Sequence, residues 1–208
     1  LIRFVRDIYG TNGSIPLHAP SFYGNEKKYV LNAIESTFVS SVGEYVNNFE
    51  HKVAEYTGVK YAIATVNGTA ALQICLKLAD VAQDTEVITQ SLTFVATCNA
   101  ISYCGGDPIF VDVNRSTLGL SPLALKEFLE QQCEIRDDGN CWNKISNRKI
   151  VACLPMHTLG MPVKIDAIKE VCDRYRIALV EDAAESLGSF HKNLLTGKIG
   201  KVAILSFN

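Results

Sequence analysis

Short apolar runs alternate with helical patterns along the chain after about residue 60, and this alternation constrains the fold more than any other feature. The predicted strands lie at 61–66, 86–89, 108–112, 150–154, 177–180 and 202–207. The predicted helices between them lie at 69–78, 94–103, 121–130 and 164–175, and the polar stretch 132–148 is expected to be a surface excursion. Short strands that are apolar throughout and alternate with helices are typical of a mainly parallel sheet covered on both faces. The sequence therefore predicts an α/β fold.

Two more helices are predicted before this alternation begins. The first opens at Asn25, a residue type that helix N-caps favour. The second covers 44–57, where apolar residues recur at steps of three and four, and Gly58 follows in the position of a C-cap glycine. We therefore divide the chain into an N-terminal helical segment, 1–58, and a larger domain, 59–208.

Composition narrows the range of partners and compartments. The 208 residues carry a formal net charge of −2, so neither nucleic acid nor an anionic membrane surface is expected as a partner. No apolar run reaches the roughly 18 residues of a membrane span, and the first residues lack a signal-peptide pattern. The seven cysteines form no C-x-x-C pair, which favours buried free thiols in a reducing cytoplasm over a metal site.

Ligands of parallel sheets bind beyond the carboxyl ends of the strands, so polar residues at those ends are candidates. Asn67, Gly68 and Thr69 lie between a predicted strand and a predicted helix. Free N–H groups at a helix start attract an anion, Gly68 lets that anion approach the main chain, and Thr69 can add a hydroxyl donor. The same residues also fit an ordinary turn with a helix cap. Neither a P-loop nor a G-x-G-x-x-G motif occurs.

Three carboxylates, Glu181, Asp182 and Glu185, follow the predicted strand 177–180. Carboxylates at the end of a buried strand are costly unless they are paired or bind a ligand. A pyridine nitrogen is one suitable partner, because an aspartate beside it keeps it protonated and the ring can then accept electrons. A helix cap or a structural ion pair is the alternative interpretation.

Two further candidates follow other predicted strands. Phe94, at the start of a helix, could stack on a flat ring, although core packing is the default for such an aromatic residue. Ser206, after the last predicted strand, could donate a hydrogen bond to a phosphate group. Neither residue indicates a function by itself.

Taken in order, these motifs resemble the DegT-type family of pyridoxal-phosphate-dependent sugar aminotransferases, which have the aspartate-aminotransferase (type I) fold. The resemblance covers roughly 15–208. The motifs that carry it are Asn-Gly-Thr-Ala-Ala-Leu at 67–72, Thr-Phe-Val-Ala-Thr at 93–97, Asp-Pro-Ile-Phe-Val-Asp-Val at 107–113, Glu-Asp-Ala-Ala-Glu-Ser-Leu-Gly at 181–188 and Leu-Ser-Phe-Asn at 205–208.

The resemblance implies a role for five residues around the cofactor, pyridoxal 5'-phosphate. Gly68, Thr69 and Ser206 would hold its phosphate group. Phe94 would stack on its ring, and Asp182 would pair with the pyridinium nitrogen as the catalytic carboxylate.

Two other residues receive less direct assignments. Glu185 stands where the family usually has Gln or His in contact with the ring hydroxyl, and a carboxylate would repel a phenolate oxygen unless one of them is protonated. His157 follows a predicted strand and is assigned to the sugar pocket, with a satisfied loop histidine as the alternative. His18 is given no role, and no metal ligands are assigned.

The resemblance also implies the reaction and the partners. Glutamate would donate its amino group, and the C4 ketone of a UDP-linked 4-keto-6-deoxy-N-acetyl sugar would receive it, in a homodimeric enzyme of bacterial surface glycan biosynthesis. Segments 15–29 and 39–43 indicate this subgroup. The chain is expected to be the N-terminal portion of such an enzyme, without its small C-terminal domain. The Schiff-base lysine is expected at the third residue beyond Asn208, since neither Lys198 nor Lys201 fits its motif.

Two alternatives stay open. Some family members have His in place of that lysine and act as sugar 3-dehydrases with the amine form of the cofactor. A non-catalytic fragment that binds pyridoxal phosphate is the other. A dehydrogenase is disfavoured, because the turn at 67–69 lacks the glycine spacing of a dinucleotide site.

Overall fold

The computed structural model describes residues 1–16 and 19–207. His18 and Asn208, both considered above, lie outside the described residues. The chain divides into two compact units, Leu1–Phe49 and Glu50–Asn208, and each is described by itself.

The first unit contains helices α1 (Ile2–Tyr9) and α2 (Glu26–Glu35) and the start of α3 (Glu44–Thr57). The Tyr45 hydroxyl donates to Asn32 Oδ1 at 3.0 Å, so α2 and the first turn of α3 are tied by a side-chain hydrogen bond. The Tyr45 ring also packs against the Tyr29 ring, with centroids 5.4 Å apart.

The predicted caps concern the N-terminus of α2 and the C-terminus of α3. Asn25 occupies the N-cap position of α2 as predicted, but its side chain makes no cap hydrogen bond. Glu26 Oε2 instead accepts from the N–H of Gly24 at 2.9 Å. Helix α3 has the predicted bounds, and Gly58 follows it with φ of 69°, a left-handed conformation that favours glycine.

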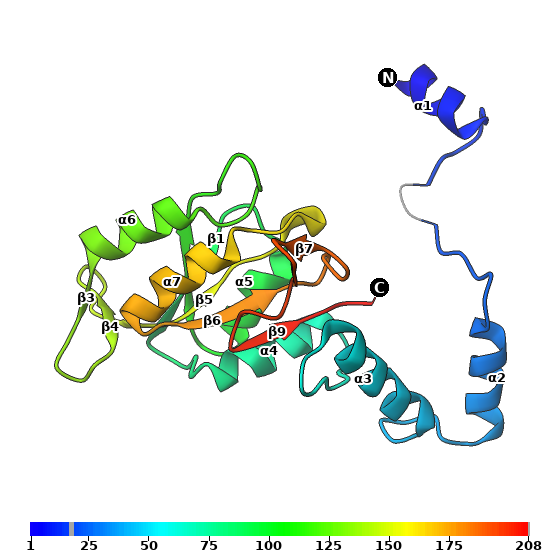
Figure 1. The fold of residues 1–208 in the computed structure, drawn as a ribbon, viewed down its shortest axis with the longest axis horizontal. Helices are drawn as coiled ribbons and strands as arrows, with labels where there is room; N and C mark the ends of the chain where they lie inside the picture. Colours follow the sequence, from blue (N-terminus) through cyan, green and yellow to red (C-terminus); the bar gives the residue numbers. More distant parts are fainter. Residues whose placement is uncertain (17–18, 208) are drawn as a thin grey trace. The chain divides into compact units, whose positions relative to one another are not determined.

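A seven-stranded sheet forms the centre of the second unit (Figure 1). Its strands are β1 (Thr85–Gln90), β2 (Asp107–Val111), β3 (Cys133–Ile135), β4 (Cys141–Asn143), β5 (Lys149–Leu154), β6 (Ala178–Asp182) and β9 (Val202–Ile204). The pairs β2–β1, β1–β5, β5–β6 and β6–β9 are parallel, and the pairs β3–β4 and β4–β5 are antiparallel. A separate two-stranded sheet joins β7 (Phe190–His191) and β8 (Leu194–Leu195). The predicted mainly parallel sheet is confirmed.

Helices cover both faces of this sheet, as predicted. They are α4 (Gly68–Leu78), α5 (Val95–Tyr103), α6 (Pro122–Gln132) and α7 (Ile165–Tyr175), with the 3₁₀ helix η1 (Thr158–Gly160) between β5 and α7. One apolar core joins α4 and α5 to the sheet and includes Val87, and the other joins α6 and α7 to it and includes Ile88. Adjacent residues of β1 thus enter opposite cores, because successive side chains of a strand point to opposite faces.

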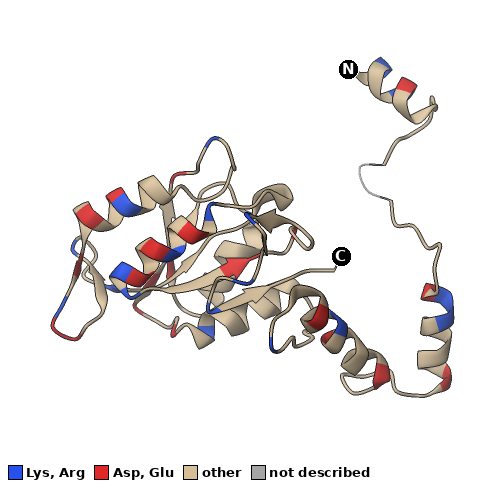
Figure 2. Ribbon diagram, in the orientation of Figure 1, with Lys and Arg blue, Asp and Glu red and all other residues tan. Residues whose placement is uncertain are grey.

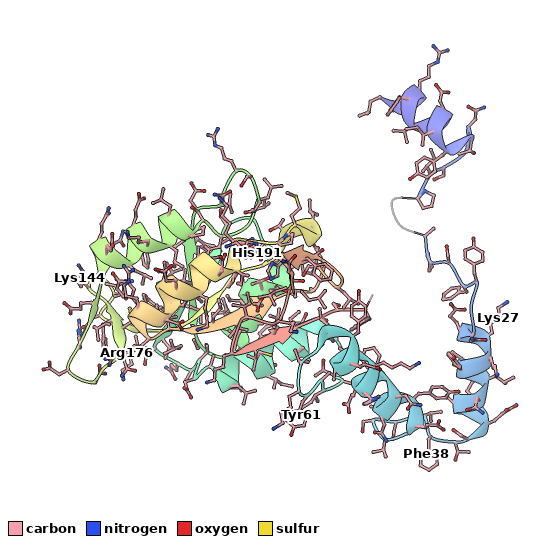
Figure 3. All side chains as sticks on the ribbon, viewed as in Figure 1. Lys27, Phe38, Tyr61, Lys144, Arg176 and His191 are labelled. Carbon is pink, nitrogen blue, oxygen red and sulfur yellow. The ribbon has the colours of Figure 1, made fainter. Side chains whose placement is uncertain are left out.

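The strand predicted at 61–66 is wrong. Residues 61–66 form an irregular, largely exposed segment, in which Tyr61, labelled in Figure 3, is 74% exposed. No described strand pairs with this segment, and a strand without a partner cannot form a ladder of main-chain hydrogen bonds. The final predicted strand is shorter than expected and ends at Ile204, so that Ser206 lies beyond its carboxyl end.

The stretch 132–148 adds two strands that the sequence did not predict. Strands β3 and β4 form an antiparallel hairpin that pairs with β5 through β4. The Trp142 ring anchors the hairpin: its Nε1 donates to the Asp138 carboxylate at 3.2 Å, and the Arg136 guanidinium lies 4.5 Å from its centroid. The polar composition that suggested an excursion instead belongs to a hairpin with one solvated face.

Charged residues of both signs occupy the outer faces of α6 and α7 (Figure 2). They form ion pairs one helical turn apart, such as Lys126–Glu130 and Glu170–Arg174. Within 1–16 and 19–207, no helix is both long and apolar enough to cross a membrane.

Candidate functional site

The sequence-predicted cofactor residues come from the carboxyl ends of neighbouring parallel strands and from two helix starts. Phe94 follows β1, Asp182 ends β6 and Ser206 follows β9. Asp182 lies opposite Ile204 in the β6–β9 pairing, two residues before Ser206. Gly68, the first residue of α4, lies at the same edge, because a Cβ atom on it would be 3.3 Å from Ser206 Oγ.

Asp182 is the buried carboxylate of this edge, with 2% of its surface exposed. Its Oδ2 accepts a hydrogen bond from the Thr97 hydroxyl at 2.8 Å, and its Oδ1 accepts from the Ala184 N–H at 3.3 Å. Burial raises the pKa of the Asp182 carboxyl above its ordinary value, while the Thr97 hydrogen bond acts in the opposite direction. Such a carboxylate is stable in its ionised form when a cation pairs with it.

The main chain holds Asp182 on both sides. Its N–H donates to Pro155 O and its carbonyl accepts from His157 N–H, each at 3.0 Å. The buried Gln90 side chain fixes the neighbouring strand end, because it donates to Met156 O at 3.2 Å and accepts from Met156 N–H at 3.1 Å. These hydrogen bonds therefore join the carboxyl ends of β1, β5 and β6 around Asp182.

The start of α4 and the segment after β9 meet at Gly68 and Ser206. A Cβ atom on Gly68 would lie 3.3 Å from Ser206 Oγ, so a larger residue would crowd the serine hydroxyl. The Asn67 side chain caps α4 by accepting from Ala70 N–H at 2.8 Å. Gly68 and Thr69 precede Ala70, and N–H groups at these first helical positions have no partner within the helix. These donors and the helix dipole make this corner suitable for an anion.

Phe94 offers an aromatic face at the same edge. It is the N-cap residue of α5, with extended backbone, and its side chain is 61% exposed. Its main-chain N–H lies 3.3 Å from Met156 Sδ, which ties the start of α5 to the end of β5. The residue is thus held by its backbone while its ring stays outside both cores.

His157 does not line an open pocket, contrary to its assignment. It is fully buried, its Nδ1 accepts from the Val163 N–H at 3.2 Å, and its Nε2 lies 3.1 Å from Glu181 Oε2. Because the main-chain donor faces Nδ1, the ring proton is on Nε2 and points to Glu181. The alternative of a satisfied histidine is the one that the structure supports.

Glu181 is the structural carboxylate of the pair at the end of β6. Besides His157, it accepts main-chain N–H groups from Gly197, Ile199 and Gly200 at 2.9, 2.7 and 2.6 Å. Burial acts to raise the pKa of Glu181, but the hydrogen bonds from His157 and these N–H groups outweigh it and hold the pKa below its ordinary value. Neighbouring side chains of a strand point to opposite faces, so Glu181 and Asp182 have different environments.

Glu185 is exposed and lies near η1. Its Oε2 accepts from the Leu159 N–H at 2.7 Å, and Leu159 has a positive φ of 54°. This carboxylate therefore already satisfies one donor of the chain itself, while its remaining lone pairs are open to another group.

Sequence reasoning missed the threonine that contacts Asp182. Thr97 lies within the motif at 93–97, but a single threonine in a helix carries no signal of its partner.

Lys201 lies away from the site: its Nζ donates to Leu78 O at the far end of α4. A hollow of about 620 Å³ lies at the amino ends of β1, β5 and β6, opposite the candidate site. It is lined in part by their first residues, Thr85, Lys149 and Ala178. We assign the hollow no role, because the anion donors and Asp182 lie at the opposite edge.

Within the described ranges, no group of three or more His, Cys, Asp and Glu side chains is arranged to hold a metal ion. The edge offers the buried Asp182 carboxylate, the start of α4 with the Ser206 hydroxyl, and the exposed Phe94 ring.

Comparisons with known proteins identify the family of this chain. A model of the DegT/DnrJ/EryC1/StrS aminotransferase family matches residues 21–208. EpsN of Bacillus subtilis (strain 168), provisionally named a pyridoxal phosphate-dependent aminotransferase, is 37% identical over 93% of this chain and 47% of its own length. GDP-perosamine synthase of Caulobacter vibrioides is 35% identical over 93% of this chain and 47% of its own length. The chain thus spans about half the length of these relatives.

A solved structure extends the likeness to three dimensions. The aminotransferase from Psychrobacter cryohalolentis superposes with a TM-score of 0.78 and 28% identity, over 92% of this chain and 45% of the other. The similarity in fold therefore extends over 92% of this chain.

Proposed function

Because the chain belongs to the DegT/DnrJ/EryC1/StrS aminotransferase family, we propose that the whole protein is a pyridoxal-phosphate-dependent sugar aminotransferase. Its amino donor is glutamate, and its acceptor is the C4 ketone of a UDP-linked 4-keto-6-deoxy-N-acetyl sugar. The observation that carries the proposal is the common edge of the sheet, where the buried Asp182 carboxylate lies near the Gly68–Ser206 contact.

The residues at this edge fit the cofactor chemically. The first N–H groups of α4 and the hydroxyls of Thr69 and Ser206 would hold the phosphate group. Asp182 would hold the proton on the ring nitrogen, and the exposed Phe94 ring would pack on the flat face. Glu185 would lie towards the ring hydroxyl, provided that one of the two oxygens is protonated.

Bound pyridoxal phosphate supplies an electron sink for the negative charge that develops when an amino acid loses its α-proton. The contribution of Asp182 is electrostatic, because its buried carboxylate keeps the ring nitrogen positive. The carboxylate needs no movement to do so, since Thr97, Ala184 and its own main chain already fix it.

The compartment and the assembly are part of the proposal. All seven cysteines are free, which supports a reducing cytoplasm. We also propose that the whole protein is a homodimer, on the ground of the family resemblance alone.

The test is to incubate the whole protein and pyridoxal phosphate with glutamate and a panel of 4-keto sugars linked to UDP or GDP. We expect 2-oxoglutarate and an aminated UDP-linked sugar, both detected by mass spectrometry. A GDP-linked product would keep the activity and correct the nucleotide, since one relative is named for a GDP-linked sugar. Loss of water from the sugar without 2-oxoglutarate would favour the dehydrase. Cofactor binding without any turnover would favour the non-catalytic alternative.

A further inference from the structure

A chain of two hydroxyl groups runs from the start of α5 to Asp182. The Thr97 hydroxyl donates to Asp182 Oδ2, and the Thr93 hydroxyl donates to Thr97 Oγ1, both at 2.8 Å. Thr97 is fully buried and Asp182 is 2% exposed, so water does not compete for the bond between them, whereas Thr93 is partly buried. The chain therefore links the carboxylate to the segment that carries Phe94.

The direction of the hydrogen bonds is fixed by proton counting. A threonine hydroxyl has one proton, and an ionised carboxylate can only accept. The proton of Thr97 must therefore point to Asp182. The Thr93 hydroxyl has two acceptors within reach, Thr97 Oγ1 at 2.8 Å and Met156 Sδ at 3.3 Å. Its proton points to Thr97, because two hydroxyl oxygens 2.8 Å apart need a proton between them. Hydrogen bonds arranged head to tail polarise one another, so Thr93 strengthens the donor that reaches Asp182.

The charges that act on Asp182 come from the elements beyond β5 and β6. Glu185 disfavours its ionised form. His157 adds no positive charge, because its Nδ1 accepts from the Val163 N–H and its ring is therefore neutral. Helix α5, which supplies Thr97, contains no charged residue. Thr97 thus stabilises the carboxylate without adding a positive charge, which would repel a protonated pyridine ring placed beside Asp182.

We infer that Thr97 is a positioning residue that acts through Asp182: its hydroxyl holds this side chain as an oriented carboxylate and so keeps the shared proton on the ring nitrogen of pyridoxal phosphate. The inference rests on the proposed function, since it requires that the cofactor binds at this edge. Thr93 assists as the donor to Thr97. Without the hydroxyl of Thr97, the buried carboxylate is less stable and the proton moves from the ring towards Asp182.

The experiment uses the whole protein with pyridoxal phosphate labelled with ¹⁵N in its ring. The variants are Thr97→Val, which removes the hydroxyl at nearly constant shape, Thr97→Ser, which keeps it, and Thr93→Val. Thr89→Val is the matched control, because Thr89 is also fully buried but its hydroxyl donates to Leu154 O. The readouts are the ¹⁵N shift of the ring nitrogen, which separates its protonated and neutral forms, and the Kd of the cofactor by equilibrium dialysis.

We expect Thr97→Val to weaken cofactor binding about tenfold, the usual scale for a hydrogen bond to a charged group, and to shift the ring nitrogen towards its neutral form. Thr97→Ser and Thr89→Val should keep the wild-type shift, and Thr93→Val should move it in the same direction as Thr97→Val by less. If Thr97→Val does not fold, the shift in Thr93→Val decides, and an unchanged shift there counts against the inference.

Two other results would overturn it. A wild-type ring shift and Kd in Thr97→Val would overturn the inference alone. Wild-type protein that does not bind the cofactor would overturn the proposed function, and the role of Thr97 with it.

Discussion

At the scale of single residues, the adjacent carboxylates Glu181 and Asp182 have opposite environments. Glu181 is saturated by His157 and by main-chain donors, and its pKa is lowered. Asp182 is buried with fewer donors, and its pKa is raised. Neighbouring groups whose pKa values move apart commonly divide structural and chemical roles. The geometry therefore assigns stability to Glu181 and leaves Asp182 available for a ligand.

Replacing Glu181 by Gln should destabilise the fold by about 2–6 kcal/mol at neutral pH, because the amide keeps one acceptor oxygen and leaves two buried donors unsatisfied at about 1–3 kcal/mol each. A carboxyl with a lowered folded pKa contributes stability above its ordinary pKa of 4.5, and that contribution is lost as the pH falls through the folded value. The difference between wild type and Glu181→Gln should thus shrink on acidification. Urea unfolding from neutral to acidic pH measures it.

The matched control for this prediction is Glu170→Gln, which breaks an exposed pair with Arg174. Its expected cost is below about 0.5 kcal/mol, since exposed ion pairs contribute little. Equal losses of stability in the two variants would contradict the structural role of Glu181.

At the scale of helices and strands, two caps offer a matched pair. Asn67 caps α4 and Ser121 caps α6, each by accepting the main-chain N–H of the third helical residue. We expect Asn67→Ala and Ser121→Ala each to cost about 1 kcal/mol of stability. Only Asn67→Ala should also weaken phosphate-dependent cofactor binding, because only α4 begins beside Ser206. Unfolding curves measure the loss of stability, and the Kd of inorganic phosphate measures the loss of anion binding. Equal phosphate affinities in Asn67→Ala and Ser121→Ala would contradict an anion site at the start of α4.

Local pattern predicted most helices and strands, and long-range pairing explains the exceptions. The helix α3 and the cap Ser121 follow from residues within one or two turns, so the sequence contains the whole signal. The run 61–66 has strand composition but no partner, and pairing is not a local property. The hairpin at 132–148 was missed because its strands are short and polar.

The site shows the same division. Gly68, Asp182 and Ser206 were predicted from position at strand ends and from motif, and the sheet brings their elements to one edge. Thr97 was missed because its contact with Asp182 spans 85 residues of sequence. His157 was misassigned because the sequence does not reveal that Glu181 and the Val163 N–H occupy its ring nitrogens.

At the scale of the whole molecule, one sheet separates two apolar cores, and the candidate site lies where the strands between them end. Ile101 of α5 belongs to one core and Ile168 of α7 to the other, and both are fully buried. Removing one methylene from each tests whether the cores act as one cooperative unit. Because the two residues lie on opposite faces and share no cluster, their effects on stability should add.

We expect Ile101→Val and Ile168→Val each to lower the free energy of unfolding by about 0.5–1.5 kcal/mol, and the double variant to lose their sum within about 0.5 kcal/mol. Ile74→Val is the control, since Ile74 on α4 is 52% exposed and its loss should be small. Urea unfolding followed by far-ultraviolet circular dichroism and by the fluorescence of Trp142 gives the free energies. Trp142 reports on the hairpin that pairs with β5, and β5 supplies residues to both cores. A single coincident transition for both probes would mean that the two cores unfold together, so that destabilising either core also destabilises the strand ends that hold Asp182. Separate transitions would mean that each core unfolds independently.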